Sequence, residues 1–99
     1  MKKIYSFLFA ALLCVGANAT SYTISVSGTS YSPNTLTVSI GDVVTIEASA
    51  SHPLVQVDNT VWTANGTTSL STGWGETTAN HTFTITNTNT IYYVCKNHV

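Results

Sequence analysis

The chain has 99 residues, of which 43% are hydrophobic and only 7% charged, and its formal net charge is −1. This length allows a single domain, and a chain with so few basic residues lacks the positive surface that neutralises nucleic-acid phosphates. The composition therefore excludes a multidomain protein and argues against nucleic-acid binding.

The first 19 residues are typical of a secretory signal peptide. The basic start Met1–Lys3 precedes an apolar run from Ile4 to Val15, and Gly16–Ala19 supplies the small residues of a cleavage site. The run is shorter than the roughly 20 residues of a membrane-spanning helix. We therefore predict that residues 1–19 are removed after Ala19 and that the mature chain is periplasmic or secreted, without a membrane span. A lipid anchor at Cys14 is an alternative.

Residues 20–99 form the second predicted unit, a single domain built from short strands. Alternating apolar and polar residues predict strands at 22–27, 35–40, 43–48 and 80–86, and runs rich in β-branched and aromatic residues predict strands at 54–57 and 91–94. Gly41-Asp42 leaves so short a connection that the second and third strands are expected to pair as a hairpin. Residues 58–79 lose this periodicity and predict a long loop with at most one short strand at 61–63, and no helix is expected after the signal peptide. The pattern predicts an all-β sandwich.

Residues able to bind a metal lie near the end of the last predicted strand. Cys95 ends that strand and His98 follows three positions later, and without the signal peptide Cys95 is the only cysteine. A thiolate and an imidazole so close on one loop can bind the same ion. His52, far upstream, precedes Pro53 in a predicted loop. The alternatives are a buried, inert Cys95 and an ordinary loop histidine at position 52, and His81 is expected to be structural or exposed.

Two stretches resemble the cupredoxins, the blue-copper electron carriers, and among them the plastocyanin-like group. The stretch SPNTLTVSIGDVVTIEASASHP looks like the family's strand pair leading to its first histidine ligand, and IYYVCKNHV looks like the strand and loop with Cys-x-x-His. The resemblance implies a cupredoxin-like Greek-key β-sandwich. It also implies one type 1 copper, cycling between Cu(I) and Cu(II), with His52, Cys95 and His98 as its ligands.

The sequence departs from the family's pattern after the second histidine. The family has a methionine ligand and a closing strand there, whereas this sequence ends at Val99 and has Met1 as its only methionine. We therefore expect a copper-binding domain that is incomplete at its C-terminus and lacks the last strand. Pro53 also replaces the asparagine that often follows the first histidine, which puts the usual hydrogen bonds near the cysteine in doubt.

These features together predict a monomeric, exported protein that carries single electrons between redox protein partners and is not an enzyme. By resemblance, His98 lies near the surface and is the electron port. Three other functions use the same residues differently: a copper carrier or buffer without a redox role, a metal-free structural or adhesive β-sandwich, and a fragment of a multicopper oxidase. In every metal-binding case, the affinity for the metal decreases as the pH is lowered, because protons compete for the donor atoms.

Overall fold

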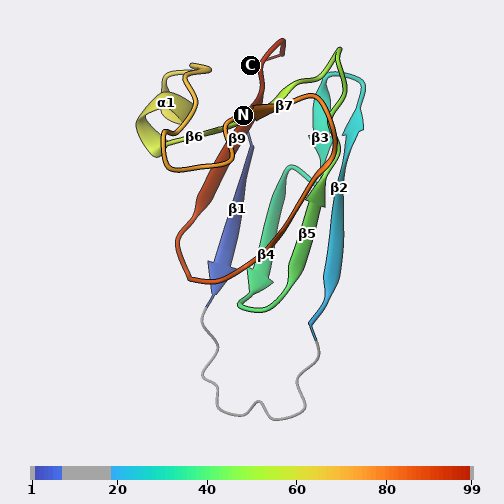
Figure 1. The fold of residues 1–99 in the computed structure, drawn as a ribbon, viewed down its shortest axis with the longest axis vertical. Helices are drawn as coiled ribbons and strands as arrows, with labels where there is room; N and C mark the ends of the chain where they lie inside the picture. Colours follow the sequence, from blue (N-terminus) through green and yellow to red (C-terminus); the bar gives the residue numbers. More distant parts are fainter. Residues whose placement is uncertain (1, 8–18, 99) are drawn as a thin grey trace.

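The computed structural model describes residues 2–7 and 19–98, which form two β-sheets and one short helix (Figure 1). One sheet has five strands in the order β4-β1-β9-β6-β7, and the other has four in the order β3-β2-β5-β8. The strands are β1 (Lys2–Phe7), β2 (Ser21–Ser27), β3 (Ser30–Ser32), β4 (Thr35–Ser39), β5 (Val43–Ile46), β6 (Leu54–Val57), β7 (Glu76–Thr77), β8 (His81–Thr84) and β9 (Ile91–Cys95). The predicted all-β class is confirmed.

The hydrophobic core lies between the two sheets. In β5 the side chains of Val44 and Ile46 are fully buried while their neighbours are only partly buried, which is the alternation of a strand with one face inward. Other strands, and Ile85 just after β8, contribute the remaining buried members of this core, which are Ile24, Tyr31, Val38, Leu54, Ile85, Tyr93 and Cys95. Cys95 therefore belongs to the core as well as to the end of β9.

The predicted hairpin between the second and third strands is wrong, because β4 and β5 lie in different sheets. β4 pairs in parallel with β1, and β5 pairs in parallel with β2 and antiparallel to β8. The connection crosses between the sheets, with Gly41 at a φ of 97° and the Ser39 N–H donating to Asp42 Oδ2 at 2.8 Å. This arch lets Val38 and Val44 reach the same core from opposite sheets.

A helix, α1 (Asn59–Thr63), stands where the sequence predicted a loop or a strand at 61–63. The Asp58 side chain caps it by accepting a hydrogen bond from the Val61 N–H at 2.8 Å. Val61 and Trp62 pack against a second cluster on the outer face of the five-stranded sheet, formed by Val55, Val57 and Val94. No helix within the described residues has the length and apolar character needed to span a membrane.

Lys2–Phe7 of the predicted signal peptide form β1, which lies between β4 and β9 (Figure 1). Ile4 pairs with Leu36 on one side and with Ile91 on the other. Most of the predicted signal peptide, residues 8–18, lies outside the described residues, and cleavage after Ala19 stays a prediction.

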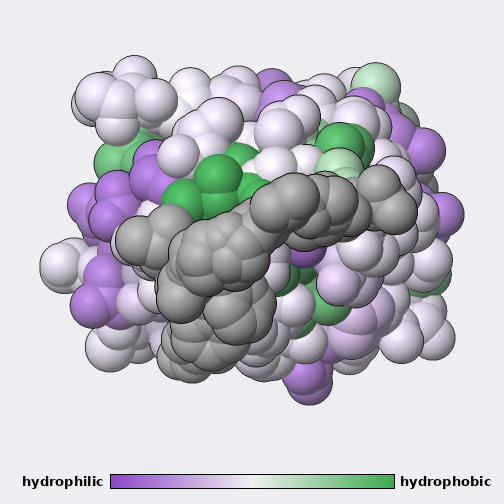
Figure 2. All heavy atoms as spheres, turned by 90° about the horizontal axis from the view of Figure 1, so that it is seen from below, coloured by the Kyte–Doolittle hydropathy of each residue, from purple (hydrophilic) through white to green (hydrophobic). Residues whose placement is uncertain are grey.

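Figure 2 views the end of the molecule opposite the C-terminus of β9, where polar residues predominate and hydrophobic ones show as separate green areas.

Candidate metal centre

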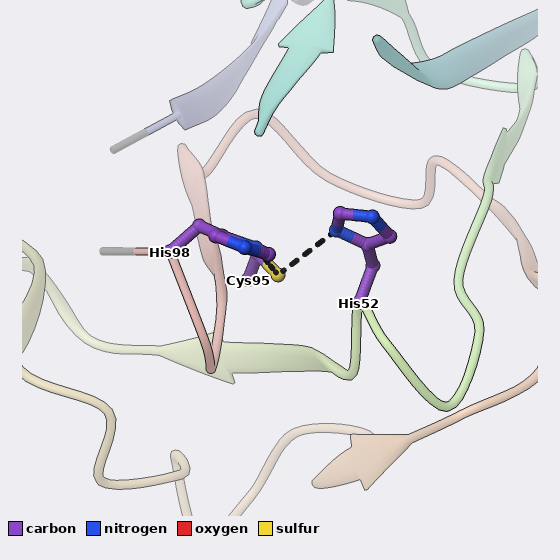
Figure 3. A group of neighbouring side chains, drawn as sticks. All are labelled: His52, Cys95 and His98. Carbon is purple, nitrogen blue, oxygen red and sulfur yellow. Dashed lines mark hydrogen bonds between the residues drawn. The ribbon is translucent and has the colours of Figure 1, made fainter. Parts of the chain in front are cut away.

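Pairing between β6 and β9 brings His52 next to Cys95, although 43 positions separate them. Cys95 is the last residue of β9 and lies opposite Leu54, the first residue of β6. His52 stands two residues before Leu54, in the loop that enters β6, so the register of one strand pair fixes both side chains. His98 lies on the loop that leaves β9 (Figure 3).

Backbone hydrogen bonds hold the two loops in place. Ser49 and His52 exchange a pair of bonds, with the Ser49 N–H donating to the His52 carbonyl at 3.2 Å and the His52 N–H to the Ser49 carbonyl at 3.0 Å. The Lys96 N–H donates to the Pro53 carbonyl at 2.9 Å, which extends the β6–β9 ladder past its last pair. The His98 N–H donates to the Cys95 carbonyl at 3.1 Å, so the Cys-x-x-His segment closes as a turn.

Asn97 joins the two loops directly. Its side-chain amide donates to the Ser51 carbonyl at 3.1 Å, one residue before His52. Asn97 was not predicted from the sequence, although a polar side chain between a cysteine and a histidine of one short loop is a usable signal. This bond makes Asn97 a positioning residue for both histidine-bearing segments.

The three predicted metal ligands converge on one point (Figure 3). Cys95 Sγ lies 3.7 Å from His52 Nδ1 and 3.3 Å from His98 Nδ1. The two imidazole rings have centroids 4.8 Å apart and an interplanar angle of 33°. The ligand atoms of His52, Cys95 and His98 all lie within 4.8 Å of one another. These residues can therefore hold a metal ion.

Known bond lengths show that this spacing suits a single ion. Bonds of about 2.0 Å to nitrogen and about 2.3 Å to sulfur, as zinc makes, separate the donor atoms by roughly 3.5 to 3.7 Å at tetrahedral to trigonal angles. The two observed separations between sulfur and nitrogen, 3.3 and 3.7 Å, bracket that range. Two imidazoles and one thiolate are also a donor set that copper and zinc both accept.

Exposure to solvent differs among the three residues. Cys95 is a free cysteine with only 6% of its surface exposed, His52 is partly buried and His98 is exposed. The sulfur is thus shielded by the two sheets, while the His98 imidazole is exposed to solvent, as the resemblance implied. Beside the site, Lys96 forms an exposed ion pair with Glu76, its Nζ lying 3.1 Å from Oε1.

Two buried tyrosines pack in the same core cluster as Cys95. Tyr93 lies two positions before it in β9, and its ring meets that of Tyr31 edge-on with centroids 5.0 Å apart. Neither hydroxyl has a hydrogen-bond partner among the described residues. Burial raises the pKa of Tyr31 well above its ordinary value and the nearby Cys95 thiol adds to the rise, while burial and then Tyr31 raise the pKa of Tyr93. The raised pKa values favour the neutral phenols, so this layer beneath Cys95 is uncharged but holds two buried polar hydroxyls.

His81 lies apart from the metal cluster. It belongs to β8 in the other sheet, and its ring contacts those of Trp74 and Phe83 at centroid distances of 4.5 and 5.4 Å. Partial burial lowers its pKa, which favours the neutral imidazole. The predicted structural role of His81 agrees with these contacts.

Comparison of the chain with protein-family models, with curated proteins and with solved structures gave no match. The fold and the cluster of His52, Cys95 and His98 are therefore the observations that bear on function.

Proposed function

We propose that this chain is an exported, mononuclear copper-binding protein that carries single electrons between redox proteins. The observation that carries the proposal is the convergence of His52, Cys95 and His98 within 4.8 Å at one end of a two-sheet β structure. The resemblance of the two ligand-bearing segments to plastocyanin-like cupredoxins supports copper as the metal, with one ion per chain.

The donor chemistry also favours copper. Among the divalent metals of the first row, copper binds a given set of nitrogen and sulfur donors most tightly, and the soft thiolate suits Cu(I) while imidazole suits both oxidation states. Copper bound by two imidazoles and one thiolate supplies one-electron redox chemistry.

The chain's own contribution is to hold the donors rigidly and to control access to them. The β6–β9 ladder fixes Cys95 beside the His52 loop, and the Asn97 side chain bonds that loop to the one carrying His98. A donor set that is held in place before and after a change of charge has little to reorganise. The exposed His98 gives a redox partner a contact with the site, whereas the buried Cys95 sulfur stays shielded from solvent and from other thiols.

The experiment that tests the proposal is the addition of Cu(II) to the purified protein, followed by visible absorption and metal analysis. We expect one copper per chain and an intense visible band from charge transfer between the Cys95 thiolate and copper. Cys95→Ser removes the sulfur at nearly constant volume and should abolish the band. His81→Ala is the matched control, because it deletes a histidine outside the cluster and should leave the band unchanged. A colourless complex in the wild-type protein would contradict the proposal.

A copper carrier would use the same three ligands, so ligand substitutions do not separate it from an electron carrier. The rate of electron self-exchange between the oxidised and reduced proteins does. Rapid exchange is expected for the proposed function, whereas very slow exchange with tight Cu(I) binding would assign the site to copper transport or buffering.

A further inference from the structure

Asp42 is a buried carboxylate at the arch between β4 and β5, with 6% of its surface exposed. Both of its oxygens accept backbone hydrogen bonds. The Ser39 N–H donates to Oδ2 at 2.8 Å, and the Thr20 N–H donates to Oδ1 at 2.9 Å. A buried carboxylate normally has a cationic partner, and none contacts Asp42 among residues 19–98, whose side chains the structure describes.

The sequence leaves few cations that could serve this carboxylate. The chain has three lysines and arginines in total, which are Lys2, Lys3 and Lys96. The first two belong to the predicted signal peptide and leave with it. Lys96 is engaged with Glu76 near the metal cluster. In the processed chain, the new α-amino group, which is mostly protonated at neutral pH, would be a further cation in addition to Lys96.

That amino group would form at the atom that already contacts Asp42. We propose that cleavage after Ala19 creates an ion pair between the α-ammonium of Thr20 and the buried Asp42 carboxylate. In this step a signal-cleaving protease adds water across the Ala19–Thr20 amide, which leaves a carboxylate on Ala19 and an amine on Thr20 that takes up a proton. One neutral N–H donor thereby becomes a charged group with three donors.

The surrounding structure holds the new terminus in position. The Val43 N–H donates to the Thr20 carbonyl at 2.9 Å, and Ser21 begins the parallel pairing of β2 with β5. The ion pair therefore fastens the start of β2 to the arch. Cleavage also removes β1, the strand beside β4. The arch therefore loses a neighbouring strand and gains the ion pair in the same cleavage. This inference is independent of copper binding.

The test uses the protein exported from cells. Intact mass and N-terminal sequencing should show that it begins at Thr20. A double-mutant cycle then combines Asp42→Asn with a chain that keeps Ala19 as its first residue, which moves the ammonium one residue away. We expect the two changes to be coupled by about tenfold in the unfolding equilibrium constant, as for a charge-assisted bond. Asp58→Asn, in an exposed carboxylate, is the control and should show no coupling to the Ala19 start.

A chemical measurement covers the case in which Asp42→Asn does not fold. The α-amino group of the wild-type exported protein should react with an acetylating reagent about tenfold more slowly in the folded state than in denaturant, because the paired ammonium is held protonated and shielded. Equal rates in the two states, a first residue other than Thr20, or absence of coupling in a folded cycle would overturn the proposal.

Discussion

The buried hydroxyl of Tyr93 offers a sharp test of the packing beneath the metal cluster. Tyr93 is fully buried and its hydroxyl has no hydrogen-bond partner among the described residues. A buried polar group without a partner costs about 1 to 3 kcal/mol. Tyr93→Phe removes that hydroxyl and keeps the ring that meets Tyr31 edge-on. We therefore expect the metal-free variant to be more stable than the wild type by about 1 kcal/mol.

Urea unfolding followed by tyrosine and tryptophan fluorescence measures this difference. In a domain of this size, 1 kcal/mol also raises the melting temperature by about 4 to 8 °C, which calorimetry resolves. Tyr92→Phe is the matched control, since Tyr92 is the adjacent residue, is only partly buried, and packs on Trp62 at the outer face of the sheet. It should change the stability by less than about 0.5 kcal/mol. A loss of 1 kcal/mol or more in Tyr93→Phe would refute the reasoning, because it would mean that the hydroxyl is bonded.

Three further predictions concern pH, the first strand and the helix. Burial raises the pKa of Tyr31 and Tyr93 above the ordinary 10.0, so the unfolded state loses these protons first and the free energy of unfolding should decrease as the pH rises above about 10. Urea unfolding at pH 8 and pH 10.5 should show a smaller decrease in the variant that combines Tyr31→Phe and Tyr93→Phe than in the wild type. An equal decrease in both proteins would contradict this. In the unprocessed chain, Ile4→Pro should speed amide exchange in Thr35–Ser39 relative to Ile4→Val, because proline breaks the β1 ladder; unchanged exchange would argue against β1. Asp58→Ala should lower the free energy of unfolding in urea by about 1 kcal/mol through loss of the α1 cap, and no change would argue against the cap.

Alternation of apolar and polar residues was a sound guide to the strands. It located β2, β4, β5 and β8 to within two residues at each end, because each has one face toward the core and its side chains obey the period of two. β9 was located instead by its run of β-branched and aromatic residues, since both of its faces pack against buried clusters. The metal cluster was also predictable, since the resemblance named His52, Cys95 and His98, and the structure brings all three together.

The errors arose where a tertiary contact overrides the local pattern. A short Gly-Asp connection favours a hairpin, yet the Asp42 carboxylate bonds the Ser39 N–H at the end of β4 and the Thr20 N–H just before β2, which belong to different sheets. These bonds direct β4 and β5 into separate sheets. Asn59–Thr63 has few strong helix formers, and α1 forms there because Asp58 caps it and Trp62 packs on the sheet. Lys2–Phe7 has the composition of a signal peptide, and nothing local predicts its pairing with β4 and β9.

X-ray absorption at the copper edge is the most direct measurement of the central claim, because it counts the sulfur and nitrogen donors around the bound ion. With one equivalent of Cu(II), the wild-type protein should show one sulfur and two imidazole nitrogens around each copper, and Cys95→Ser should lose the sulfur while His81→Ala keeps all three donors. A copper environment without sulfur in the wild-type protein would contradict the account.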